Sequence, residues 1–145
     1  MLASFDKTNR RDASLVQCLK TIGMPSDRIT YLQDHEATSE AIHEQYMSML
    51  TKSKSGDHLF LYYCGHGTWT DEKTVSFCAY DYDGSNKIGW NTSEMVQLLI
   101  DNFKGEHVLI AADCCHSGRF AFSILYAPPP FFFLIMSTTW FKNLP

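Results

Sequence analysis

Two short clusters hold the residues of this chain whose types and spacing could do chemistry. The first is Gly65-His66-Gly67, and the second is Asp113-Cys114-Cys115-His116-Ser117-Gly118. A short apolar run, residues 58–63 or 107–112, comes directly before each cluster and predicts a buried strand. Two neighbouring parallel strands would bring the imidazole and a thiol to the carboxyl edge of one sheet, where the active sites of open α/β folds lie. The sequence therefore predicts a cysteine nucleophile with a histidine partner.

The predicted chemistry is attack of a cysteine on a carbonyl carbon. Cysteine attacks as the thiolate, and a nearby imidazole favours that form and later protonates the leaving amine. Tight glycine turns direct backbone N–H groups towards the developing oxyanion. The N–H groups of Gly67, which follows His66, and of Cys115 are the candidate oxyanion donors. Chemistry of this kind requires no cofactor.

These motifs resemble those of the caspase-like peptidases, and most closely those of the metacaspases. The matching residues are Cys64-Gly65-His66-Gly67 and the whole second cluster. Residues 56–63 and Arg11-Asp12-Ala13 extend the resemblance, which covers residues 9–119. It implies that Cys115 is the nucleophile and that His66 is its acid/base partner.

The resemblance also implies a substrate preference. Metacaspases use two aspartates to hold an Arg or Lys before the scissile bond, and the matching residues here are Asp12 and Asp113. A carboxylate and a basic side chain form a charge-assisted hydrogen bond, which explains such a preference. We therefore expect a cysteine endopeptidase that cleaves peptide or protein substrates after Arg or Lys.

The chain departs from the family pattern in three places. The apolar opening strand of the family is absent or reduced to residues 1–5. Trp90, Asn91 and Thr92 stand where an acidic pair binds calcium in some metacaspases, so calcium activation is not expected. Nothing after Arg119 resembles the small-subunit half of the family. We therefore expect a catalytic, large-subunit domain over residues 1–119 and an apolar tail, rich in Pro and Phe, over residues 120–145.

Two other classes of function remain open from the residues alone. A truncated caspase-like domain could be catalytically idle and act as an interaction or regulatory module, pairing with a full-length caspase-like partner through an exposed sheet edge. A metal site is the other class, because Cys64, His66, Cys114, Cys115 and His116 offer sulfur and nitrogen ligands. The ligand spacings typical of structural zinc sites are missing, so we expect no metal.

The remaining pattern predicts alternating helices and strands. Such alternation favours a mainly parallel central sheet with helices on both faces. With the resemblance, it implies a caspase-like three-layer α/β sandwich with an incomplete set of elements. Gly23 is expected to stop the first helix, Thr38 to cap the second, and Asn91 with Glu94 to open the third. The predicted elements are a helix over residues 11–22, a strand over 29–32, a helix after Thr38, a polar loop over 68–73, an extended segment over 75–79 and a helix after Asn91.

Length, net charge and cysteine content limit the partners and the cellular compartment that we expect. The chain has 145 residues, which suits one domain, and a net charge of −4 without a basic run, so nucleic-acid binding is not expected. Its five cysteines are an odd set with one vicinal pair, which favours a reducing, cytoplasmic setting over a disulfide framework. Residues 120–141 carry no charge, but three consecutive prolines within them argue against a membrane-spanning helix.

Overall fold

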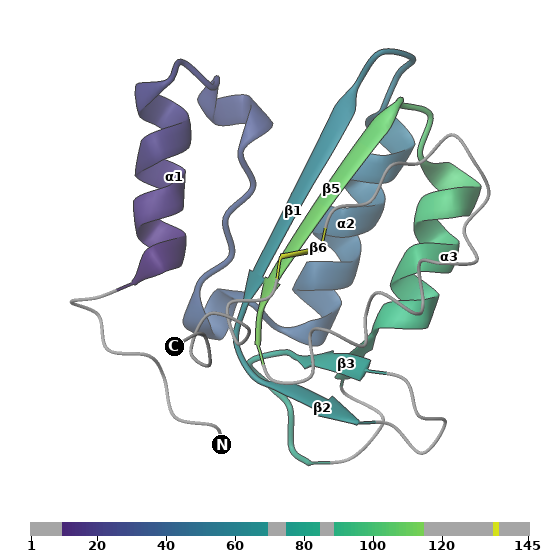
Figure 1. Ribbon diagram of the computed structural model, residues 1–145. Coiled ribbons are helices and arrows are strands. Elements are labelled where there is room, and N and C mark those ends of the chain that lie inside the picture. Colours follow the sequence, from purple (N-terminus) through teal and green to yellow (C-terminus); the bar gives the residue numbers. More distant parts are fainter. Residues whose placement is uncertain (1–9, 70–74, 85–88, 115–134, 137–145) are drawn as a thin grey trace, which may run out of the picture.

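The computed structural model describes residues 10–69, 75–84, 89–114 and 135–136 (Figure 1). Its helices and strands alternate less regularly than the pattern predicted, because the described helical elements before residue 53 follow one another without a strand and several short strands then precede the third α-helix. In order they are α1 (Arg11–Thr21), η2 (Ser26–Arg28), η3 (Asp34–Glu36), α2 (Ser39–Lys52), β1 (His58–Cys64), β2 (Gly67–Trp69), β3 (Val75–Cys78), β4 (Gly89–Asn91), α3 (Thr92–Asn102), β5 (His107–Asp113) and β6 (Ile135–Met136).

The central sheet contains the two apolar runs as neighbouring parallel strands. β1 and β5 pair without a bulge from His58 opposite His107 to Cys64 opposite Asp113. β6 lies parallel on the other side of β5, so two residues of the apolar tail join this sheet. The prediction that both chemical clusters follow adjacent parallel strands is confirmed for these two strands.

A second sheet, antiparallel and three-stranded, follows the histidine cluster. Its order is β2-β3-β4, and it contains the extended segment expected at residues 75–79. The expectation of a polar loop at residues 68–73 was wrong for Thr68 and Trp69, which belong to β2. Strands of three residues are too short to produce a periodic pattern, so β2 and β4 were missed.

Helices cover both faces of the central sheet, which confirms the predicted α/β class. Figure 1 shows α1 on one side of β1 and β5, and α2 with α3 on the other. Alternate residues of β5 are buried on the side of α2 and α3, because side chains of a strand point to opposite faces in turn. The main core lies there and consists of Tyr46, Leu50, Phe77, Trp90, Met95, Val96, Leu99, Phe103, Val108, Ile110, Ala112 and Cys114.

Local signals set the helix ends as expected. The Thr38 hydroxyl accepts a hydrogen bond from the Ala41 amide at 3.2 Å, and the Asn91 carboxamide oxygen accepts one from the Ser93 amide at 2.8 Å. α1 ends in a Schellman motif, in which the Met24 amide donates to the Leu19 carbonyl at 2.9 Å. Gly23 supplies the left-handed residue that this motif requires, with φ at +93°.

The strand expected at residues 29–32 is not formed. Ile29 and Gln33 have extended backbone angles, but within the described ranges no strand pairs with this segment. An extended backbone becomes a strand only when a neighbour supplies the ladder of hydrogen bonds. The segment instead connects η2 to η3 on the α1 side of the sheet (Figure 1).

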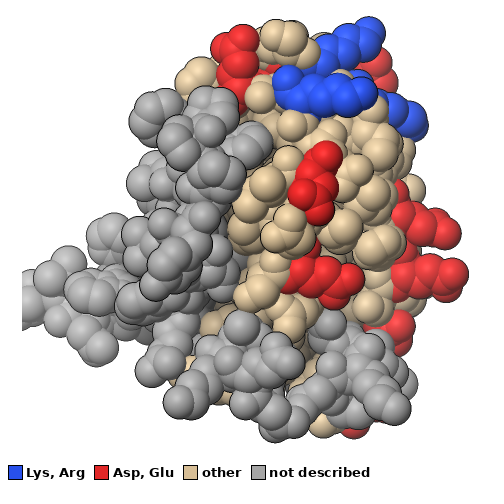
Figure 2. Space-filling view, turned by 90° about the vertical axis from the view of Figure 1, so that its right-hand side faces the viewer, with Lys and Arg blue, Asp and Glu red and all other residues tan. Residues whose placement is uncertain are grey.

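The surface over α2 and α3 carries mixed charge. Figure 2 shows Asp and Glu spread along this described face, whereas Lys and Arg gather at one end. That end is the one from which β1 and β5 start, opposite to their carboxyl ends. Of the helices that the structure describes, none is long and apolar enough to cross a bilayer.

Truncation of Leu50 would test whether the core around it stabilises the fold. Its side chain is fully buried, so Leu50→Ala should lower the free energy of unfolding by about 3 kcal/mol through lost contacts and a residual cavity. Urea unfolding followed by circular dichroism would measure the change. Ile22→Ala is the control, because Ile22 is 72% exposed and its truncation should cost less than about 0.5 kcal/mol. Equal losses in both variants would contradict this description of the core.

Candidate active site

The turn that carries His66 is held by its backbone. His66 follows β1, its side chain is exposed, and its carbonyl oxygen accepts two hydrogen bonds. The Tyr63 hydroxyl donates one at 2.7 Å and the Cys78 amide donates the other at 2.9 Å. Burial raises the pKa of Tyr63, so this hydroxyl keeps its proton and remains a donor. The position of His66 is therefore fixed by β1 and β3 together.

The Tyr63 ring connects that turn to the core. It stacks on Phe77 of β3 with ring centroids 4.2 Å apart. Gly65 passes so close to this ring that a Cβ atom there would lie 2.7 Å from the ring carbon that carries the hydroxyl. Only glycine fits between Cys64 and His66 without a shift of Tyr63.

The two chemical clusters begin side by side. Cys64 opposite Asp113 is the last pair of the β1–β5 register, and the Gly65 amide then donates to the Asp113 carbonyl at 3.3 Å. By sequence, His66 stands two residues after Cys64 and Cys115 two residues after Asp113. Cys115 lies outside the described residues, as do His116, Ser117 and Gly118. The His66–Cys115 geometry therefore stays a prediction.

The Gly67 amide is directed away from the antiparallel sheet. Gly67 pairs with Phe77, and the flanking bond runs from the Cys78 amide to the His66 carbonyl. This arrangement makes Gly67 and Phe77 a non-hydrogen-bonded pair, in which neither amide points towards the partner strand. An amide with this orientation suits the oxyanion role predicted for Gly67.

A second thiol lies at the same edge. Cys64 is half-buried at the end of β1, and its pKa is raised above the ordinary 9.0, first by burial and then by the negative charge of Asp113. Burial, followed by Cys64 and Asp113, likewise raises the pKa of Tyr62. Cys64 is therefore a protonated thiol near neutral pH and a poor nucleophile.

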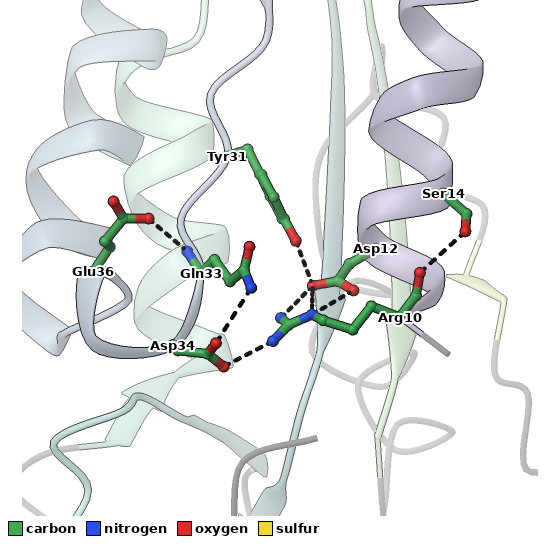
Figure 3. Close-up of polar contacts among 7 residues, drawn as sticks. All are labelled: Arg10, Asp12, Ser14, Tyr31, Gln33, Asp34 and Glu36. Carbon is green, nitrogen blue, oxygen red and sulfur yellow. Dashed lines mark hydrogen bonds and ion pairs between the residues drawn. The ribbon is translucent and has the colours of Figure 1, made fainter. Parts of the chain in front are cut away.

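Asp12 is already engaged within the chain (Figure 3). Its carboxylate accepts hydrogen bonds from Nε of Arg10 at 3.1 and 3.2 Å and from the Tyr31 hydroxyl at 2.9 Å. Burial by itself would raise the pKa of Asp12, but the hydrogen bonds from Arg10, Tyr31 and the Ala13 amide outweigh it and lower the pKa below its ordinary 3.8. Asp12 is therefore a carboxylate with an internal counter-ion.

Asp113, the other residue predicted to bind substrate, pairs with Arg11. An oxygen of its carboxylate lies 3.8 Å from Nη1 of Arg11, whose side chain is 74% exposed. Exposed ion pairs of this kind contribute little to stability because solvent screens them. Burial is the main cause that raises the pKa of Tyr62, and the negative charges of Asp113 and Asp12 add to it.

The partners of Asp12 were not predicted from the sequence. Arg10, Tyr31 and Asp34 were not predicted as site residues, yet Arg10 bonds both Asp12 and Asp34. The local signal was Arg10, two residues before Asp12, whereas Tyr31 and Asp34 lie 19 and 24 residues from the residues that they bond. Across the described ranges, no three His, Cys, Asp or Glu side chains gather as a metal site would require.

Comparison with known proteins assigns this chain to a family. The family described as metacaspase, peptidase C14 domain, matches residues 14–122, which include both chemical clusters. The chain therefore belongs to the metacaspase peptidase family, and its described fold is an incomplete form of the caspase-like α/β sandwich.

A relative supports the same assignment. The chain is 33% identical over 72 residues to Metacaspase-3 of Trypanosoma cruzi (strain CL Brener). The match covers 46% of this chain and 20% of the relative, so the chain spans about one fifth of that protein's length.

Gly65→Ala should destabilise the chain by about 2 kcal/mol, because its Cβ would overlap Tyr63 and displace the turn. Thermal unfolding would measure the loss. Gly84→Ala is the control: Gly84 has φ of +92°, and a Cβ there would meet none of the described atoms within 4 Å, so backbone strain of about 1 kcal/mol is the expected cost. A loss at Gly65 no larger than that at Gly84 would contradict the close approach to Tyr63.

Cys64 should react slowly with iodoacetamide at pH 7.5, and its rate should still be rising at pH 9, because its raised pKa leaves little thiolate below that pH. Peptide mass spectrometry after timed labelling would give the rate at each cysteine. Exposed Cys18 serves as the accessible reference in the same sample. A rate at Cys64 that levels off well below pH 9 would show a reactive thiolate instead.

Proposed function

We propose that this chain is a cysteine endopeptidase domain in which Cys115 is the nucleophile and His66 its acid/base partner. The observation that carries the proposal is the link between the two motifs. β1 and β5 pair in register to their last residues, and the Gly65 amide bonds the Asp113 carbonyl just before Cys115. Membership of the metacaspase peptidase family supports the same chemistry.

The reaction has two steps. The Cys115 thiolate attacks the substrate carbonyl carbon and forms a C–S bond, while the Gly67 and Cys115 amides stabilise the oxyanion. The C–N bond then breaks and protonated His66 gives its proton to the leaving amine. In the second step, His66 takes a proton from water, the water oxygen attacks the thioester, and the C–S bond breaks to release the acid and the thiolate.

We further propose that cleavage follows Arg or Lys. Asp113 stands at the end of β5, two residues before Cys115 in sequence, and its carboxylate lies 3.8 Å from Nη1 of the exposed Arg11 side chain. A carboxylate with such a partner can exchange it for a substrate guanidinium, which binds a carboxylate with two parallel hydrogen bonds. Asp12, from the first turn of α1, is the second carboxylate of this pocket.

The test is turnover of a fluorogenic peptide ending in Arg, compared with the same peptide ending in Asp. Cys115→Ala should abolish turnover, and His66→Ala should lower kcat by about 100-fold or more. Cys18→Ala is the matched control, since Cys18 is an exposed thiol on α1, and it should leave turnover unchanged.

A peptidyl electrophile with mass spectrometry completes the test. Labelling at Cys115 that is lost in His66→Ala would support the dyad. Full turnover by Cys115→Ala would overturn the proposal. Absence of both labelling and turnover in a folded sample would also overturn it and leave an idle domain.

A further inference from the structure

We propose that Arg10 occupies the pocket for the substrate's basic side chain and competes with Arg or Lys of a substrate for Asp12. Arg10 is then a specificity-determining residue, because it sets how tightly the chain binds basic substrates. This inference rests on the proposed function, in which Asp12 is a substrate-binding carboxylate. It adds that Arg10 is bonded to the Asp12 carboxylate before a substrate binds.

The contacts of Arg10 are those that a bound arginine would make. Its guanidinium bonds the carboxylate of Asp12 through Nε and Nη2 and that of Asp34 through Nη1 at 2.8 Å (Figure 3). The Arg10 side chain is only 9% exposed, and those of Asp12 and Asp34 are 13% and 25% exposed. A guanidinium shielded from water between two carboxylates is held strongly, because little solvent screens the charges.

Asp12 has no acceptor capacity left for a second guanidinium. A carboxylate offers about four lone-pair positions. In this chain Asp12 accepts four hydrogen bonds: two from Nε of Arg10, one to each oxygen, one from Nη2 of Arg10 and one from the Tyr31 hydroxyl. A substrate arginine can therefore bind Asp12 only after Arg10 has left.

Asp12, Asp34 and Tyr31 form the pocket that holds Arg10. This pocket lies close enough to the carboxyl ends of β1 and β5 for its charges to act on residues there. The charges of Arg10 and Asp12 act in opposite directions on the pKa of Cys64, the residue before the Gly65-His66 turn. α1 begins at the carboxyl ends of β1 and β5, as Figure 1 shows. Arg11, the neighbour of Arg10, reaches Asp113 at the end of β5.

Competition within one chain has a defined effect on affinity. A tethered occupant acts at high effective concentration, and the observed dissociation constant of substrate rises by the inverse of the fraction of time that the pocket is open. Removal of Arg10 would also leave Asp12 and Asp34 without their shared counter-ion. Both effects predict tighter binding of a basic peptide when Arg10 is neutralised.

The experiment measures binding without chemistry. In a Cys115→Ala background, a fluorescein-labelled peptide ending in Arg is titrated and its anisotropy followed. Arg10→Gln should lower the dissociation constant about tenfold or more. The same peptide ending in citrulline, which has nearly the same shape but no charge, should show no gain.

Arg28→Gln is the matched control, because Arg28 is also an arginine paired with an aspartate, but its side chain is 66% exposed. It should leave the peptide affinity unchanged. Arg10→Lys covers the case in which Arg10→Gln does not fold. Lysine keeps the charge but cannot bond two carboxylates with a planar fork, so it should give an intermediate gain.

A merely structural role for Arg10 gives a different result. If Arg10 only stabilises the packing of α1 against η3, Arg10→Gln would lower the melting temperature and leave the peptide affinity unchanged or weaker. That outcome, equal gains with the citrulline peptide, or no binding by any variant would overturn the inference. Failure of the proposed function is read separately, from the absence of electrophile labelling at Cys115 in the unmodified chain.

Discussion

The in-register parallel pairing of β1 with β5 is the constraint on which the rest of the described structure depends. A slip of one residue would exchange the faces of one strand against the other, because side chains alternate along a strand. In the observed register, Val108 and Ile110 are buried against α2 and α3, whereas Asp113 carries its charge at the α1 side. The same register sets the His66 turn level with the end of β5.

Core packing, more than the turn itself, positions the histidine. Tyr63 stacks on Phe77, which is fully buried, and its hydroxyl bonds the His66 carbonyl. β3 holds the same carbonyl through the Cys78 amide. A functional residue held in this way by packed elements keeps its geometry better than one on an unsupported loop. The His66 turn is therefore held in place by Tyr63, Phe77 and Cys78.

The α1 side of the sheet has a different character from the core side. α1 has no fully buried residue, and Ile22 at its end is largely exposed. Ion pairs and hydrogen bonds from Arg10 and Tyr31 hold the start of this helix instead. Contacts of that type can exchange partners, because another guanidinium offers the same bonds. The described chain thus has a densely packed apolar core on one face of the central sheet and ion pairs at the start of α1 on the other.

The sequence by itself determined the family, the helices with their caps and the two central strands, because these depend on local pattern and on motifs of fixed spacing. The prediction was wrong at residues 29–32, where the extended backbone has no neighbouring strand among the described residues, and it missed β2, which is too short to show a period. Only the tertiary structure decided that Asp12 is paired with Arg10 and Tyr31, and that Gly65 bonds Asp113. The bonds from Tyr31 to Asp12 and from Gly65 to Asp113 join residues far apart in sequence, so packing of the whole chain, and not local propensity, selects them.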